Sequence, residues 1–583
     1  MQRIWVRHPL AAAASLTLAL MACAPAQPSI SIAPADSPGT SSSPTRTKSI
    51  VVGVSNAVDA LSIMGSSTTS GGWQSLNELH SQGLVTADRN VQRPIPRVAS
   101  QLPSIDSGNI EILADGRMKT VYPLRRDVTW QDGTPFTAHD LTFGFELNSD
   151  KGMPFLNRDA IQEMHSVEAL DDYTFVIYWR GPYYQADSVG LRAMWPHPRH
   201  ILEGQYRTID RAAFINLPYW TSEYVHLGPF RLSEFHAGES LAFTAFDGYF
   251  LGRPKVDRVI VRVSNDETSL YAATLAGAID ILMDNSLSAE LGLQLKDEWE
   301  RGGKGIVHVG TGTTRFIAPQ FDPAVQQFPP ALDPRVRQAL YYAVDRKSVS
   351  DAVQLGHGEL FANSLLPPGD RLYEATKDGF ARYTYDPARS RGMLTQLGWN
   401  PGGDGVLVGP DGRRFGTSLW TTEGGEREIA VIADYWKQIG VFAEQYIIAG
   451  AIVRDREART KYPGFETSAR GSSDSILSRF DSRTASVAST NYSGANRGGY
   501  KSPRMDDLVD RYRQSVPERD QGIAIRAVSD LVAEDLPVLP LYFNPTTPAV
   551  RAGIKALDDF MGGAEPSRLF GTFSRNSHEW DVP

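Results

Sequence analysis

Histidines and paired carboxylates are the side chains of this sequence best suited to metal binding or acid–base chemistry. His197 and His200 stand close together, but the prolines on either side of His197 interrupt the helix that a metal-binding pair would need. Asp171-Asp172 and Asp506-Asp507 are more typical of turns and helix starts than of acid–base partners. We therefore expect no metal site and no catalytic group at these positions.

The sequence contains none of the common enzyme signatures. There is no Gly-x-Ser-x-Gly elbow, no His-Glu-x-x-His zinc helix and no phosphate loop ending in Gly-Lys-Ser/Thr. Asp404–Gly412 carries Asp-Gly pairs like a calcium loop, but Val406–Val408 stand where oxygen ligands are needed. A β-hairpin that turns at Pro410–Gly412 is the better interpretation. We expect neither an enzyme nor a bound cofactor.

The single cysteine, Cys23, has a different chemistry. Residues 1–8 are basic, and Pro9–Ala22 is mainly apolar but too short for an ordinary membrane-spanning helix. The end of this stretch, Leu-Met-Ala-Cys, resembles the lipobox of bacterial lipoproteins, in which the cysteine is lipidated. We expect residues 1–22 to be a lipoprotein signal peptide and residues 23–49, rich in Ala, Pro, Ser and Thr, to be a lipid-anchored flexible tether. The alternative is an ordinary signal peptide with an incidental cysteine.

The composition describes a soluble body. The chain has 583 residues, 41% hydrophobic and 21% charged, with a formal net charge of −9. Length alone predicts about three to four domains, and the acidic balance argues against nucleic acid as a partner.

Short strands alternate with helices, which indicates a mixed α/β fold. Thr120–Leu124 is an extended run, and a turn at Asp132–Pro135 leads to a helix capped by Thr137 and Asp140. Further strands are predicted at Ser49–Val54, Asp172–Trp179, Leu241–Phe246, Arg258–Val263 and Val538–Phe543, and helices after Asp333, around Val349–Val353, after Ser502 and around Ala524–Val532.

The segment from Tyr122 to Asp140 resembles the signature of family 5 solute-binding proteins, the oligopeptide-, dipeptide- and nickel-type receptors of ABC importers. Its matching residues, which we interpret as determining the fold, are Leu124, Arg125, Trp130, Asp132, Gly133, Pro135, Thr137, Ala138 and Asp140. The segment departs from the pattern at Pro123 and Gln131. Further blocks of the family follow in order, among them Gly228–Leu232, Tyr249–Lys255, Leu275–Asp280, Asp333–Arg346, Tyr385–Ala388, Ile439–Val441 and Tyr500–Pro503.

The resemblance implies a two-lobed, periplasmic-binding-protein-like fold of type II, hinged around a cleft, with an additional α+β domain on the first lobe. The implied domains are lobe I (50–85, 190–300 and 535–583), the additional domain II (86–189) and lobe III (301–534). We expect a monomer.

The resemblance also implies where a peptide would bind. In peptide-binding members an Asp for the ammonium group follows a Trp in the second lobe; here Asp474 is the best match, but the preceding Trp is missing. Arg470 is a candidate for a carboxylate, and Trp420 for an aromatic wall. Asn491 and Tyr492 are candidates for the same cleft. Each has an ordinary structural alternative, a surface turn or core packing.

The implied function is an extracytoplasmic receptor, lipid-anchored at the outer face of the cytoplasmic membrane. It would capture a peptide or another small solute by hinge closure and deliver it to the permease. Nickel chelates, sugars, haem-like compounds and opines are rival ligands. An extracellular hydrolase or a sensory lipoprotein on the same scaffold are the alternative functions.

Overall fold

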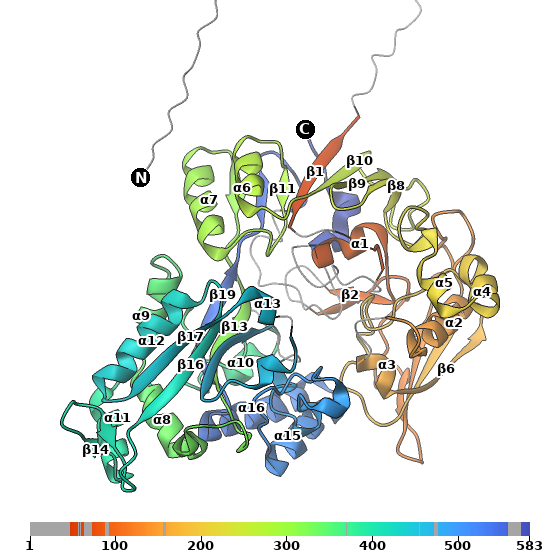
Figure 1. The fold of residues 1–583 in the computed structure, drawn as a ribbon. Coiled ribbons are helices and arrows are strands. Elements are labelled where there is room, and N and C mark those ends of the chain that lie inside the picture. The colour runs from red at the N-terminus through yellow and green to blue at the C-terminus, as the bar shows by residue number, and fades with distance from the viewer. Residues whose placement is uncertain are drawn as a thin grey trace, which may run out of the picture. The chain divides into compact units, whose positions relative to one another are not determined.

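The computed structural model describes residues 47–55, 58, 60–62, 73–87, 93–154, 159–368, 370–453, 455–471, 476–557 and 573–583. Cys23, the apolar leader and most of the predicted tether therefore lie outside the described residues, as does Asp474. Residues 47–583 form one compact unit (Figure 1).

A seven-stranded mixed sheet contains the first strand of this unit. Its order is β12-β20-β11-β1-β10-β9-β8, and β1 pairs in parallel with β10 and β11. The strands are β1 Ser49–Val54, β8 Phe230–His236, β9 Ser240–Ala245, β10 Arg258–Val263, β11 Ile281–Leu282, β12 Gly305–Val307 and β20 Ala549–Arg551. Helices α1 Asn77–His80, α4 Arg199–Thr208, α5 Arg211–Ile215, α6 Glu267–Leu275 and α7 Ala289–Arg301 belong to the same part of the chain.

A four-stranded antiparallel sheet contains the start of the family signature, since Tyr122 and Pro123 end its strand β5. Its order is β4-β5-β7-β6, with β4 Ile110–Ile112, β5 Met118–Pro123, β6 Met164–Asp171 and β7 Thr174–Trp179. Helices α2 Ala138–Ser149 and α3 Asp159–Glu163 accompany it, and a small hairpin pairs β2 Val85–Ala87 with β3 Pro94–Pro96. The predicted Thr137–Asp140 capping box is confirmed, since Asp140 Oδ2 accepts a hydrogen bond of 2.9 Å from Thr137 N.

A five-stranded sheet forms the third part, in the order β17-β16-β18-β13-β19. The strands are β13 Gly310–Pro319, β16 Gly416–Thr422, β17 Phe442–Ile448, β18 Phe465–Arg470 and β19 Leu539–Thr546. Its helices are α8 Pro334–Tyr342, α9 Arg346–Val353, α10 Tyr373–Thr376, α11 Pro387–Gln396, α12 Glu426–Gln438, α13 Gly450–Val453, α15 Pro503–Gln514 and α16 Glu518–Asp535.

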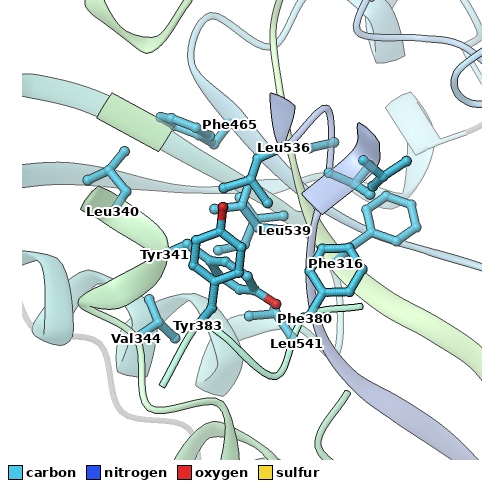
Figure 2. Packing of buried hydrophobic residues seen from close by; sticks show 14 of the residues in the cluster. Phe316, Leu340, Tyr341, Val344, Phe380, Tyr383, Phe465, Leu536, Leu539 and Leu541 are labelled. Atoms are coloured by element: carbon cyan, nitrogen blue, oxygen red, sulfur yellow. The ribbon is translucent and has the colours of Figure 1, made fainter. Parts of the chain in front are cut away.

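The apolar core of this third part lies between the sheet and helices such as α8, α12 and α16. Figure 2 shows a section of it in which Tyr341 and Tyr383 pack with ring centroids 4.8 Å apart. The hydroxyl of Tyr341 donates to the carbonyl of Pro540 in β19, at 2.5 Å. The hydroxyl of Tyr383 donates to the carbonyl of Ala533 in α16, at 2.6 Å, so both rings are buried with their polar atoms satisfied.

The predicted hairpin at Pro410–Gly412 is also confirmed. Val408 forms an antiparallel bridge with Arg414, and Gly409 N donates to the carbonyl of Arg413 across the turn at 2.8 Å. Strands β14 Asn400–Pro401 and β15 Leu407–Val408 form a separate pair that turns at residues 402–406. Gly412 has a φ of +78°, which is accessible to glycine at little cost.

Candidate functional site

Three parallel strands of the five-stranded sheet end at one edge. β16 pairs in parallel with both β17 and β18, so Thr422, Ile448 and Arg470 are the last residues of neighbouring strands. In open α/β sheets, ligands bind outside the carboxyl ends of the strands. We therefore take this carboxyl edge as the candidate functional site.

The loops that follow β16 and β17 meet at the carboxyl edge. A Cβ atom built on Gly450, at the start of α13, would lie 3.8 Å from both carboxylate oxygens of Glu423. The Glu423 side chain is exposed, and no hydrogen bond ties it to another described residue. It is an acceptor available to a bound cation.

Arg470 ends β18 opposite Thr314 of β13, so it stands at the carboxyl edge. Its role as a carboxylate ligand stays a prediction. Its Nε is buried and has no hydrogen-bond partner among the described residues. Burial, and then the neighbouring Arg497, lower the pKa of Arg470 to about 10. Arg470 is thus a guanidinium with unused hydrogen-bonding capacity.

Trp420 lies on the face of the sheet that also carries Glu466, its register partner in β18. It is half-buried and packs on Tyr446 of the edge strand β17, with ring centroids 4.3 Å apart. The two rings form an aromatic surface near the carboxyl edge, and the role of Trp420 in ligand binding stays a prediction.

Asn491 and Tyr492 are placed elsewhere. Tyr492 lines a hollow of about 600 Å³ together with Gln320 and Asp322, which follow β13. Because β13 ends at Pro319, opposite the first residue of β18, this hollow lies towards the other edge of the sheet from Arg470. Asn491 is exposed, with a φ of +49°. The structure does not bring this pair to Arg470.

A buried polar network on the opposite face fixes the carboxyl edge to helix α12. Arg315 of β13 forms a two-pronged ion pair with Glu428, with Nε–Oε2 at 2.8 Å and a second contact at 2.9 Å. The Tyr542 hydroxyl donates to the same carboxylate at 2.5 Å, and Arg315 also reaches Thr467 in β18. Burial disfavours the charged guanidinium, but Glu428 outweighs it and raises the pKa of Arg315 above its ordinary value.

Sequence reasoning missed this network. Arg315 and Glu428 are 113 residues apart, and neither stands in a recognisable motif. The available signal was an arginine within the strand-forming run Thr313–Ala318, where an unpaired charge would be costly.

The signature segment lies away from the carboxyl edge. It connects the four-stranded sheet to the seven-stranded sheet through side-chain contacts. Trp130 is buried and packs edge-on against His226, with ring centroids 5.4 Å apart. Asp132 accepts from Thr134 N at 3.0 Å and contacts His200 Nε2 at 2.6 Å. Gly133 has a φ of +91°, which explains glycine at this turn.

The remaining signature residues make local contacts that hold the signature segment in its conformation. Leu124 N donates to the carbonyl of Tyr173 at 2.8 Å, and Arg125 pairs with Asp127 at 2.6 Å. Pro135 forms a β-bridge with Thr129, and Ala138 is fully buried at the start of α2. Burial raises the pKa of the Asp140 carboxyl, which also accepts from Arg199 N at 3.0 Å.

Gln131, a departure from the family pattern, is the hydrogen-bonding centre of this junction. Its Nε2 donates to the carbonyls of Gly228 and Phe230, at 2.9 and 2.8 Å, and its Oε1 accepts from His226 N at 3.2 Å. It is buried. The family blocks around Gln131 and Gly228 are therefore in direct contact.

Among the described residues, no three His, Cys, Asp or Glu side chains are placed to hold a metal ion. No helix in the same residues has the length and apolar character to cross a membrane.

Comparison with known proteins gives a consistent result. A family described as "Bacterial extracellular solute-binding proteins, family 5 Middle" matches residues 94–482. The oligopeptide-binding protein AppA of Bacillus subtilis is 25% identical over 444 residues, covering 74% of this chain and 76% of AppA. Heme-binding protein A of Haemophilus influenzae is 24% identical over 489 residues, covering 77% of this chain and 82% of that protein. NikZ of Campylobacter jejuni, solved with Ni(L-His), superposes with a TM-score of 0.68 at 20% identity, covering 91% of this chain and 99% of NikZ.

Proposed function

The chain belongs to the family 5 bacterial extracellular solute-binding proteins, and on this premise we propose that it captures peptides, or a related small solute, for an ABC importer. The observation that supports the proposal most directly is Arg470, a guanidinium with an unpartnered Nε at the carboxyl edge of a sheet within the matched region. The peptide assignment follows the name of AppA.

Capture takes place by closure about a two-stranded hinge. Residues 308–309 join β12 of the first sheet to β13 of the five-stranded sheet, and residues 547–548 join β19 to β20 in the opposite direction. The two connections are paired, since His308 N donates to the carbonyl of Pro548 at 2.9 Å. We therefore move the boundaries of lobe III from the expected residues 301 and 534 to these four residues, because β12 belongs to the first sheet and β19 to the five-stranded sheet. Residues 86–189 remain the proposed additional domain. Short paired connections of this kind absorb a rotation without disturbing either sheet.

A peptide has two charged ends, and each needs a partner once it is enclosed. Arg470 serves the carboxylate. The ammonium group has two candidate partners, the exposed Glu423 and the family-matched Asp474. Trp420 and Tyr446 supply an apolar surface for a side chain.

The receptor requires no covalent chemistry. Ligand binding shifts an open–closed equilibrium, and the permease recognises the closed form. We further propose that Cys23 carries the lipid anchor, that residues 23–49 hold the monomeric body away from the membrane, and that the body stands outside the cytoplasmic membrane.

The test is identification of the solute. Mass spectrometry of small molecules released from the purified protein identifies candidates, and thermal unfolding with each candidate ranks them. Saturation at 100 times the Kd should stabilise the protein by about 2.7 kcal/mol. Stabilisation by peptides without their cleavage supports the proposal. Stabilisation by haem or a nickel chelate but by no peptide would overturn the peptide assignment, and steady release of fragments would overturn the receptor assignment.

Matched variants then locate the site. Arg470→Met should weaken peptide binding, whereas Arg456→Met, at an exposed position on the same part of the chain, should leave it unchanged. Equal effects of the two substitutions would place the peptide away from the carboxyl edge.

A further inference from the structure

Two arginine side chains converge on one buried carboxylate behind the carboxyl edge. Glu466 of β18 has a side chain only 1% exposed, and its Oε1 forms ion pairs with Arg459 and, at 3.4 Å, with Arg497. The side chains of Arg459 and Arg497 are 10% and 20% exposed. The second oxygen of Glu466 has no hydrogen-bond partner among the described residues. One negative charge therefore faces two nearly enclosed positive ones.

Two further arginines extend this group without bringing a carboxylate. Arg479 is buried, donates to the carbonyl of Ala495 at 3.2 Å, and places its guanidinium 5.1 Å from the ring centre of Phe316. Arg470 contributes its unpartnered Nε. Neither forms an ion pair with a described residue. We refer to Arg459, Arg470, Arg479 and Arg497 as the arginine cluster.

The charges of the arginine cluster are not balanced by its own surroundings. Burial and then Arg497 lower the pKa of Arg479 to about 9, as they lower that of Arg470 to about 10. Both groups remain charged at neutral pH. The Glu466 carboxylate thus pairs with two guanidinium groups, and Arg470 and Arg479 add two more that have no ion-pair partner among the described residues, a local excess of positive charge in a chain whose formal net charge is −9.

The positive charge continues on the far side of the cluster. Arg497 also lines the 600 Å³ hollow, together with Lys461 and Lys501. Asp322 is the one acidic residue of its described lining. Lys461 is paired with Glu457 at 3.9 Å, so Lys501 and the cluster member Arg497 are the cations that extend the positive charge from the arginine cluster to the hollow.

Uncompensated buried charge is costly, and the cost is recovered when a ligand supplies the missing partner. Proteins recognise carboxylates and phosphates through arginine because its donors pair with two oxygens at once. Arg470 is the member of the cluster at the edge where a solute binds.

We propose that the solute of this receptor is an anion with at least two negative charges, an acidic peptide or a small polycarboxylate, held by Arg470 with the arginine cluster behind it. This inference rests on the proposed function and narrows its substrate class. The alternative is that the chain balances the arginine cluster with its own carboxylate, Asp474, which stands four positions after Arg470 in the sequence.

Calorimetric titration with matched probes tests the proposal. Ala-Glu-Glu, Ala-Ala-Ala and Ala-Lys-Lys have the same length and differ in charge, and citrate tests a polycarboxylate that is not a peptide. We expect Ala-Glu-Glu or citrate to bind at least about 30-fold more tightly than Ala-Ala-Ala, and this advantage to shrink as salt rises. Equal affinity for the three peptides would overturn the inference and leave the proposed function standing. Failure of all four probes to bind would count against both.

Variants give a readout that does not depend on the solute. Without ligand, Arg470→Met removes a buried charge that lacks a partner, so its Tm should rise or stay level, while affinity for the anionic probe falls about 30-fold. Arg456→Met, at an exposed position, is the control and should change neither. Arg470→Lys, which keeps the charge, should retain part of the affinity.

Asp474→Asn separates the two sources of negative charge. If the solute supplies the negative charge that balances the arginine cluster, Asp474→Asn removes no competitor, and the variant binds the anionic probe at most slightly better than the unchanged protein. A large gain in anion affinity on Asp474→Asn, together with no preference for anions in the unchanged protein, would show that the chain neutralises its own cluster and would overturn the inference.

Discussion

Buried charges occupy the two faces of the five-stranded sheet in different ways. On the α12 face, Arg315 and Glu428 satisfy each other, and Tyr542 and Thr467 complete the network. On the other face, Glu466 pairs with Arg459 and Arg497, while Arg470 and Arg479 have no ion-pair partner among the described residues. The first arrangement is satisfied within the fold, and we propose that the second is completed by a ligand.

Removing one partner of the satisfied pair should expose its structural role. Glu428→Gln leaves the Arg315 guanidinium buried without a counter-charge, so we expect the free energy of unfolding to fall by about 3 kcal/mol. Urea denaturation measures the change. Glu426→Gln, an exposed position in the first turn of the same helix, is the matched control and should cost less than about 0.5 kcal/mol. A loss below about 1 kcal/mol for Glu428→Gln would show that water reaches the Arg315 site.

The same contrast explains what could be predicted at the residue scale. Arg470 was a candidate from the sequence because it lies in the segment that corresponds to the ligand-binding loop of the family, close to Asp474. Its neighbours Arg459, Arg479 and Arg497 could not be assigned to one cluster, because the contacts of Arg459 and Arg497 with Glu466, and of Arg479 with Phe316, form only in the folded chain. The spacing of the four arginines in the sequence does not indicate that their side chains lie close together in the fold.

At the scale of secondary-structure elements, the starts of two helices could be predicted from the sequence. Ser502 accepts from Met505 N at the start of α15, and Asp333 from Arg335 N at the start of α8. Both helix starts were predicted from the local Asp-Pro and Ser-Pro sequences, because helix initiation depends on residues that are close together in the chain. The pairing of β13 with β19, more than two hundred residues away, was not predicted from local pattern.

The turn between α12 and β17 depends on one glycine. Gly440 has a φ of +82°, and a Cβ atom there would lie 2.9 Å from the carbonyl oxygen of Gly405. We expect Gly440→Ala to lower the free energy of unfolding by about 1–3 kcal/mol through strain and this close contact. Gly416→Ala, at the start of β16 with open space around it, should change stability by less than about 1 kcal/mol. A similar loss of stability in both variants would show that the backbone conformation of Gly440 is not the cause.

At the scale of the whole molecule, the family signature serves the junction between sheets. Trp130, Gln131 and Gly228 are in one contact region although they lie nearly a hundred residues apart. The order of the family blocks could therefore indicate the fold from sequence alone. The solute could not be read in the same way, because proteins of this fold are named for ligands as different as oligopeptides, haem and Ni(L-His).

The carbonyl of His80 accepts from Gly228 N at this junction, at 3.2 Å, and His197 is buried close enough to His226 to lower the pKa of His226. We expect these three histidines to make the stability of the unit depend on pH. Burial lowers the pKa of His80 and His197 to about 3, and that of His226 well below its ordinary value. In the unfolded chain each histidine titrates near 6.5. The unfolded state therefore binds more protons than the folded state below that pH, and stability must fall as the solution is acidified.

The expected loss is large enough to measure by urea denaturation at a series of pH values. Between pH 7 and 5.5 each of the three histidines should remove about 1.3 kcal/mol from the free energy of unfolding. Carboxyls such as Asp140, whose pKa burial raises, also contribute to the pH dependence, so a histidine variant is needed to isolate the histidine part. His197→Gln should reduce the histidine part of the loss by about a third, whatever its effect on stability at pH 7, while the exposed His236→Gln serves as control. A pH dependence that is the same in His197→Gln as in the unchanged protein would mean that His197 is protonated in the folded molecule, and that the junction opens to water well before the molecule unfolds.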